Sequence, residues 1–193
     1  THLTTHTSMQ SHESKIDRWY QERARNFLNV RTPPSAVTLE YVNNPPMYFV
    51  DWSMCEWGTK GNRMIKGIAE YKKRKLRSDA PFLHSEGMMI PARKFHSARM
   101  MCSFHDITFH YITELDDGLF LYEEEDFKSK GLSLPSFSQV SRRGDPNDQS
   151  LVVMLDWDHF HKIADVQEME AYAPNEKRKT QNEQDGNEIR RAS

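Results

Sequence analysis

The sequence predicts an α+β domain, with a mostly antiparallel sheet around a central hairpin, flanked by N-terminal, central and C-terminal helices. Three observations predict this class. Apolar residues recur at helical spacing between residues 13 and 29. Asp116-Asp117-Gly118 is a turn sequence typical of hairpins, and residues rich in aromatic and β-favouring side chains lie on both sides of it. The five apolar residues at 151–155 are typical of a buried strand.

The elements follow in chain order from these patterns. The first helix must end before Thr32-Pro33-Pro34, because the residue that precedes a proline avoids the helical region. Met64, Ile65 and Ile68 have the spacing of the buried side of an amphipathic helix. The predicted elements are helix 13–29, strands 36–42 and 47–54, helix 62–77, strand 95–114, strand 119–122, loop 132–149, strand 151–155 and helix 159–172.

Composition and length indicate one domain with polar ends. The 193 residues are 37% hydrophobic and 28% charged, with a net charge of −2. We expect a flexible tail at 1–12, a single α+β domain at 13–172 and a disordered polar tail at 173–193. Two cysteines form no disulfide framework, and we find neither an apolar leader nor a membrane span. A cytoplasmic or nuclear protein is expected, or a viral protein made in the cytosol.

The charges are distributed unevenly along the chain. Residues 60–77 contain eight basic residues and one acid, Glu70, whereas residues 114–126 contain seven acids and no basic residue. Such asymmetry can steer an oppositely charged partner, or the two segments can pair with each other inside the domain.

A glycine turn precedes the basic segment. Gly58-Thr59-Lys60-Gly61 leads into the expected helix at 62–77, and free amides at a helix start favour a phosphate. The turn resembles the G-x-x-G loop of KH domains, which clamps single-stranded nucleic acid, and the resemblance implies backbone contacts from this turn. The alternative is a structural turn. The predicted polyanion-binding residues are Gly58, Lys60, Gly61, Arg63, Lys66 and Lys73.

Asp156 and Asp158 follow the apolar run at 151–155. In an extended strand both carboxylates would lie on one side and could hold Mg²⁺. The stretch LVVMLDWDHFHKI resembles the first metal-binding strand of diguanylate cyclase domains, which implies that Asp156 is a metal ligand. The alternative is that Asp158 caps a helix that begins at His159.

Pro45-Pro46-Met47-Tyr48 matches the PPxY ligand of WW domains, which suggests a WW-domain partner if Tyr48 is exposed. The alternative is that Tyr48 begins a strand and is buried. Trp52 and Trp57 are expected to pack in the core rather than to form a stacking platform.

These observations favour a non-catalytic interaction protein that binds nucleic acid or another polyanion through the glycine turn and basic helix. One alternative is a structural or adaptor protein, viral and matrix-like, acting through protein contacts. The other is a Mg²⁺-dependent nucleotidyl- or phosphoryl-transfer enzyme that uses Asp156 and Asp158. No organic cofactor motif is found, and homo-oligomerisation is left open.

Overall fold

The computed structural model describes residues 15–31, 39–45, 49–57, 61–123, 136–141 and 149–174. The tail predicted at 1–12 and nearly all of that at 173–193 lie outside these residues. The α+β class is confirmed. A mixed sheet of six strands has the order β1-β2-β3-β5-β6-β9, and a second sheet of three strands has the order β4-β8-β7. No helix among the described residues is long and apolar enough to cross a membrane.

The larger sheet is antiparallel except at its centre. Its strands are β1 (Leu39–Asn43), β2 (Trp52–Trp57), β3 (Arg63–Lys73), β5 (Thr108–Leu115), β6 (Gly118–Glu123) and β9 (His161–Ala164). Only β3 and β5 are parallel. Parallel neighbours need a crossover connection. This connection contains helix α2 (Pro81–Glu86), strand β4 (Met88–Pro91) and helix α3 (Ala92–His105).

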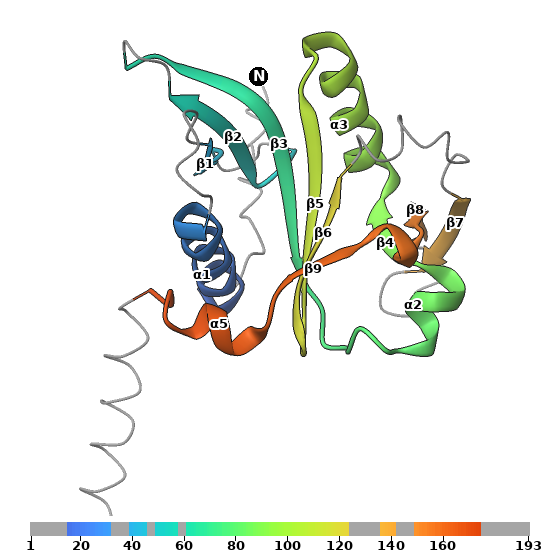
Figure 1. Cartoon of the computed structure of the whole chain (residues 1–193). Coiled ribbons are helices and arrows are strands. Elements are labelled where there is room, and N and C mark those ends of the chain that lie inside the picture. The colour runs from blue at the N-terminus through green and yellow to red at the C-terminus, as the bar shows by residue number, and fades with distance from the viewer. Residues whose placement is uncertain are drawn as a thin grey trace, which may run out of the picture.

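Helices cover both faces of this sheet (Figure 1). Helix α1 (Lys15–Arg31) and the short α5 (Val166–Glu170) lie on one face. Helix α3 lies on the other face, together with the second sheet of β4, β7 (Ser136–Ser141) and β8 (Gln149–Leu155).

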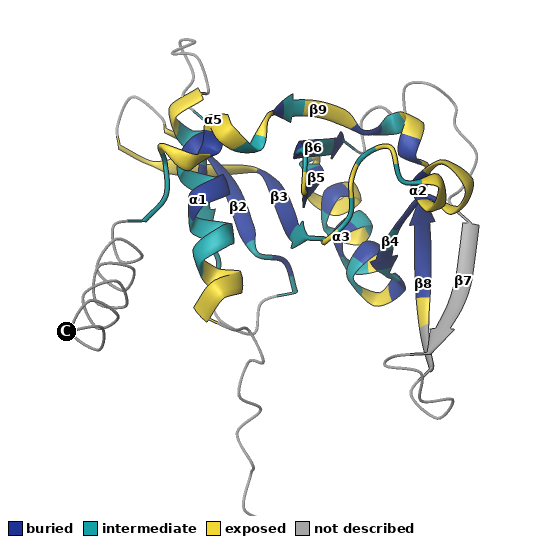
Figure 2. Ribbon diagram, turned by 90° about the horizontal axis from the view of Figure 1, so that it is seen from below, coloured by how far each residue is buried: buried dark blue, intermediate teal, exposed yellow. Residues whose placement is uncertain are grey.

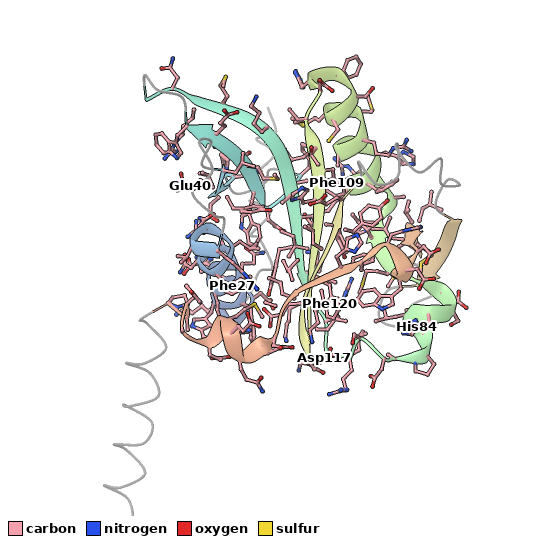
Figure 3. The ribbon with its side chains drawn as sticks, viewed as in Figure 1. Phe27, Glu40, His84, Phe109, Asp117 and Phe120 are labelled. Atoms are coloured by element: carbon pink, nitrogen blue, oxygen red, sulfur yellow. The ribbon has the colours of Figure 1, made fainter. Side chains whose placement is uncertain are left out.

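Two apolar clusters fill the space between these layers. The cluster on the α1 side contains Phe27, and the cluster on the α3 side contains Phe109, which lie on opposite sides of the sheet in Figure 3. Strand β2 is buried over most of its length, as are residues 67–71 of β3 and 152–155 of β8, whereas α1, α2 and α5 expose their outer surfaces (Figure 2). The central strands are therefore covered on both faces.

The helix predicted at 62–77 is wrong, since this segment is strand β3. Gly67 to Tyr71 are all buried, because a strand covered on both faces is apolar without alternation. A register shift opposite Met54 and Cys55 leaves Lys66 as an extra residue, which also interrupts the period of two. The apolar residues of this strand therefore have a spacing that resembles that of an amphipathic helix.

The strand predicted at 95–114 is also wrong over its first half. Residues 92–105 form α3, and only 108–115 form a strand. The buried residues of α3 are Ala92, Phe95, Ala98 and Cys102, which have helical spacing. Asp106 ends the helix in the left-handed conformation, with φ of 50°.

The helix predicted at 159–172 is replaced by three short elements: a 3₁₀ turn η2 (Trp157–His159), strand β9 and helix α5. Phe160 packs on the α3 side and Ala164 on the α1 side, which one continuous helix could not achieve. Asp158 caps no helix. Instead the Asp156 carboxylate accepts a hydrogen bond from the Asp158 amide at 3.0 Å, so Asp156 is the cap of η2.

The first helix, the central hairpin and the strand at 151–155 are confirmed, whereas the predicted loop at 132–149 is wrong where it forms a strand. The first helix spans residues 15–31, and β5 and β6 form the hairpin whose turn contains Asp117. Strand β8 includes the apolar run at 151–155. The loop predicted at 132–149 contains strand β7 at 136–141.

The basic and acidic segments pair inside the domain, as one of the two alternatives for the uneven charge predicted. Lys73 on β3 is the register partner of Glu114 on β5, and Lys73 Nζ lies 2.8 Å from Glu114 Oε1. Arg23 on α1 donates to the same oxygen at 2.7 Å, and Tyr71 Oη donates to Oε2 at 2.8 Å. Arg23 also pairs with Glu170 on α5. This network attaches α1 and α5 to the sheet.

The buried His110 on β5 predicts how stability depends on pH. Its Nδ1 lies 2.9 Å from Tyr41 Oη, and burial lowers its pKa from 6.5 to about 4. Between these two values the unfolded chain binds a proton that the folded chain does not. The free energy of unfolding should therefore fall by roughly 3 kcal/mol as the pH drops through this interval. Urea denaturation at pH 7 and pH 4.5 should show a smaller loss in His110→Gln. An equal loss in both proteins would contradict this assignment.

Candidate functional site

Two carboxylates meet where β2 and β3 lie side by side. The antiparallel register pairs Trp52 with Ala69, and extending it by one residue places Asp51 beside Glu70. Partners across an antiparallel pair share a face of the sheet, which here is the α3 side. Asp51 Oδ2 accepts a hydrogen bond from the backbone amide of Tyr71 at 2.8 Å, and this bond fixes the Asp51 side chain.

Glu70 is fully buried and holds two lysines on one oxygen. Lys94 Nζ lies 2.6 Å and Lys72 Nζ lies 3.1 Å from Glu70 Oε1. Lys72 comes from the same face of β3, two residues further on, and Lys94 comes from the first turn of α3. Glu70 Oε2 has no hydrogen-bond partner among the described residues. An orphaned buried oxygen of this kind is rare, since it costs desolvation without compensation.

Burial and charge set the protonation of this group. Burial, together with the negative charge of Asp51, raises the pKa of Glu70, and the two lysines only partly oppose the shift. Burial alone would lower the pKa of Lys72, but the charges of Glu70 and Asp51 outweigh it and raise this pKa. Lys72 is therefore a cation at neutral pH, whereas the charged form of Glu70 is disfavoured relative to an exposed glutamate, and further positive charge nearby would favour it.

A tyrosine and an arginine border the carboxylates. Tyr111 on β5 is the register partner of Glu70, and its hydroxyl donates to the carbonyl of Met89 at 3.3 Å. Burial raises the pKa of Tyr111, so the phenol stays protonated despite a hydrogen bond with Arg74. Arg74 therefore adds a third cation near this face.

The ligand set fits a hard divalent cation with phosphate. Nowhere in the described part of the chain do three or more His, Cys, Asp or Glu side chains gather to hold a metal. Mg²⁺ needs no such cage, because it is commonly bound by one or two carboxylates together with water and substrate phosphates. Asp51 and the free Oε2 of Glu70 offer this kind of ligand, and Lys72, Lys94 and Arg74 offer positive charge for a phosphate.

The structure separates most of the polyanion-binding residues from this site. Gly58 and Lys60 lie outside the described residues. Gly61 has φ of +74°, a left-handed conformation that suits glycine. The remaining three residues have partners: Arg63 pairs with Glu40, Lys66 with Glu56 and Lys73 with Glu114.

The other predicted motifs also lie elsewhere. Pro46 and Tyr48 of the PPxY motif lie outside the described residues, so this motif stays a prediction. Asp156 and Asp158 follow β8, which belongs to the smaller sheet. Their contact is the capping bond already described, and a metal there remains a prediction. Trp52 is in the core as expected, but Trp57 is exposed, so the expectation for Trp57 is wrong.

A central mixed sheet thus places two carboxylates and a lysine side by side, which are the groups that a divalent cation and a phosphate require. Comparison with known families gives one match. Residues 7–163 match the model of a family described as "Phage putative PDDEXK endonuclease". The match covers most of the chain, and the protein belongs to this family. Neither a curated protein nor a solved structure matches. Membership in a phage family supports the viral origin considered for the sequence.

Sequence reasoning missed Asp51, Glu70, Lys72 and Lys94 as site residues. The available signal was Glu70-Tyr71-Lys72 in an apolar surrounding, with Asp51 nineteen residues upstream of Glu70. Once 62–77 was assigned to a helix, this signal was hidden. A helix would not place Glu70 and Lys72 on the same face, and no pairing with β2 would follow.

Divalent metal should stabilise the protein through Asp51 and Glu70. At tenfold above its dissociation constant, Mn²⁺ should raise the melting temperature by about 3–6 °C. Because the pKa of Glu70 is raised above 4.5, protons compete with the metal already above that pH, and the stabilisation should shrink as the pH falls towards it. Differential scanning fluorimetry of wild type and Glu70→Gln from pH 5 to 8 measures this. Equal Mn²⁺ stabilisation of the two proteins would contradict the site.

Proposed function

We propose that this protein is a metal-dependent nuclease that hydrolyses phosphodiester bonds at Asp51, Glu70 and Lys72. The observation that carries the proposal is the buried Glu70 beside Asp51. One Glu70 oxygen contacts two lysines, and the other has no hydrogen-bond partner within the described segments. This proposal replaces the non-catalytic interpretation of the sequence with the enzyme alternative. It places the site at Asp51, Glu70 and Lys72 and not at the Asp156 pair.

The name of the family supports this assignment. Its letters spell Pro-Asp, followed by Asp or Glu, any residue and Lys. Val50-Asp51 and Glu70-Tyr71-Lys72 correspond to these letters, with Val50 where the name has proline. Val50 is buried in the α3-side cluster, so this position serves packing here.

The side chains have separate tasks in hydrolysis. Asp51 and Glu70 would hold Mg²⁺ or Mn²⁺, which when bound neutralises phosphate charge and makes a coordinated water more acidic. Lys72 stays protonated, so it acts as a cation and not as a base. Its charge stabilises the negative charge that grows on the phosphate oxygens as water adds to phosphorus and the bond to the leaving oxygen breaks.

Lys94 supplies a second cation from a different element. It lies closer to Glu70 Oε1 than Lys72 does, at 2.6 Å against 3.1 Å, and its side chain is 31% exposed. A phosphate that approaches the site from solvent can therefore contact its ammonium group. We assign Lys94 to phosphate binding.

Activity should depend on the β2–β3 carboxylates and not on the Asp156 pair. Asp51→Asn, Glu70→Gln and Lys72→Met should each lower the rate of Mg²⁺-dependent cleavage of plasmid or single-stranded circular DNA by about 100-fold or more. Asp156→Asn is the matched control and should keep wild-type activity. Loss of cleavage in Asp156→Asn, with activity retained in Asp51→Asn, would move the site to the position predicted from the sequence.

Removal of Lys94 should separate metal binding from catalysis. In Lys94→Met, Mn²⁺ should bind Glu70 more tightly, because a competing positive charge is gone, while kcat/KM for DNA should fall about tenfold. Lys94→Arg should restore much of the rate. Calorimetric Mn²⁺ titration and steady-state cleavage measure the two effects. A parallel loss of metal affinity and rate would indicate a purely structural lysine.

A further inference from the structure

The strands that carry the site extend beyond it as an arm. Strand β3 pairs with β5 only from Gly67 onward, whereas residues 63–65 pair with β2 alone. Strand β1 pairs with β2 on the other side. We call residues 39–43, 52–57 and 63–66 the β-arm. In Figure 1 the β-arm and α3 extend toward the same end of the molecule.

Trp57 lies on the same face of the β-arm as the site. Side chains alternate along a strand, so residues 51, 53, 55 and 57 share one face of β2. Six residues separate Asp51 from Trp57, which corresponds to roughly 20 Å along an extended strand. The face that carries the carboxylates therefore continues to an aromatic side chain near the end of the β-arm.

Trp57 is exposed and yet held in a fixed orientation. Its residue is 42% exposed, its Nε1 donates to Glu40 Oε2 at 2.8 Å, and the Arg63 guanidinium lies 4.1 Å from the ring centroid. Glu40, which also lies 3.8 Å from Arg63, can be located on the β-arm in Figure 3. A ring fixed in advance loses little conformational freedom when a ligand stacks on it.

Positive charge accompanies this face. Arg63 is half exposed at the β-arm, and Lys72 and Lys94 lie at the site. Helix α3 has three cations and no acid in its 14 residues. An aromatic ring beside a guanidinium, in line with lysines, is the combination that proteins use for single-stranded nucleic acid.

We propose that Trp57 and Arg63 form a stacking platform for an unpaired base of a single-stranded nucleic acid whose backbone continues to Asp51 and Glu70. The second half of this statement rests on the proposed nuclease function. The bases of a duplex already stack on each other, so a single fixed ring can engage only an unpaired one. A strand with duplex-like stacking rises about 3.4 Å per nucleotide, so at most roughly six nucleotides would lie between platform and site, and fewer in an extended strand.

Binding without metal tests the platform alone. A labelled single-stranded 12-mer of mixed sequence in EDTA should bind Trp57→Ala about tenfold more weakly than wild type, by fluorescence anisotropy. Trp57→Phe should lose less, and Arg63→Ala should lose affinity and salt dependence together. Phe82→Ala, which removes an exposed aromatic from α2, is the matched control and should bind normally.

A second ligand sharpens the outcome. With a blunt duplex, whose bases are already paired and stacked, Trp57→Ala should bind like wild type. Equal losses on duplex and single strand would overturn the single-strand assignment. A 12-mer affinity within twofold of wild type in both Trp57→Ala and Arg63→Ala, or no binding by wild type, would overturn the platform.

A small substrate separates this proposal from the nuclease function. Bis(p-nitrophenyl) phosphate cannot extend to Trp57, so its Mn²⁺-dependent hydrolysis should be unchanged in Trp57→Ala and abolished in Asp51→Asn. If Asp51→Asn retains hydrolysis while Trp57→Ala loses 12-mer binding, the nuclease assignment fails and the platform stands. The reverse result overturns the platform alone.

Discussion

Negative charge buried on the two central strands is the constraint on which this structure depends. Glu70 and Glu114 are both fully buried, on neighbouring strands, and point to opposite faces. Glu114 has donors on both oxygens, from Arg23, Lys73 and Tyr71. Glu70 has two lysines on one oxygen, and its other oxygen has no hydrogen-bond partner in the part of the chain that the structure describes. A buried carboxylate needs compensation. The charge of Glu114 is fully compensated by its donors, and these contacts attach α1 to the sheet. The charge of Glu70 would be fully compensated only by a further cation. This difference distinguishes the structural acid from the functional one.

The position of Glu70 depends on close contact between strands. Gly67 lies three residues before it, where β3 begins to pair with β5. A Cβ atom at Gly67 would lie 2.8 Å from both Met54 Sδ and the carbonyl oxygen of Thr108. The carbonyl group of Thr108 belongs to the backbone of β5 and cannot move aside. A side chain at position 67 would therefore separate β3 from β5. The spacing of Glu70 from Tyr111, and the pairing that brings Asp51 opposite Glu70, both rely on this approach.

The parts of the fold that could be predicted from the sequence are those set by local patterns. The first helix has one apolar stripe, and the hairpin at Asp117 has a turn that its residues require. Strand β3 could not be recognised in the same way, because burial on both faces and the extra residue Lys66 remove its alternation. The site depends on that strand. Asp51 and Glu70 are nineteen residues apart, and only the register of β2 and β3 brings them together. The charge count of residues 60–77 also misled, because it treated Glu70 as a minor exception within a basic segment and not as a site residue.

The unfilled oxygen of Glu70 has a consequence for engineering. Active sites often lower the folding stability of a protein, and the buried, incompletely paired carboxylate of Glu70 is such a position. Selection for thermal stability in the absence of metal would favour neutral, well-packed residues at position 70. Each such variant would be more stable and would have lost its activity. Selection in the presence of Mn²⁺ would remove that incentive, since the ion itself would supply the missing partner.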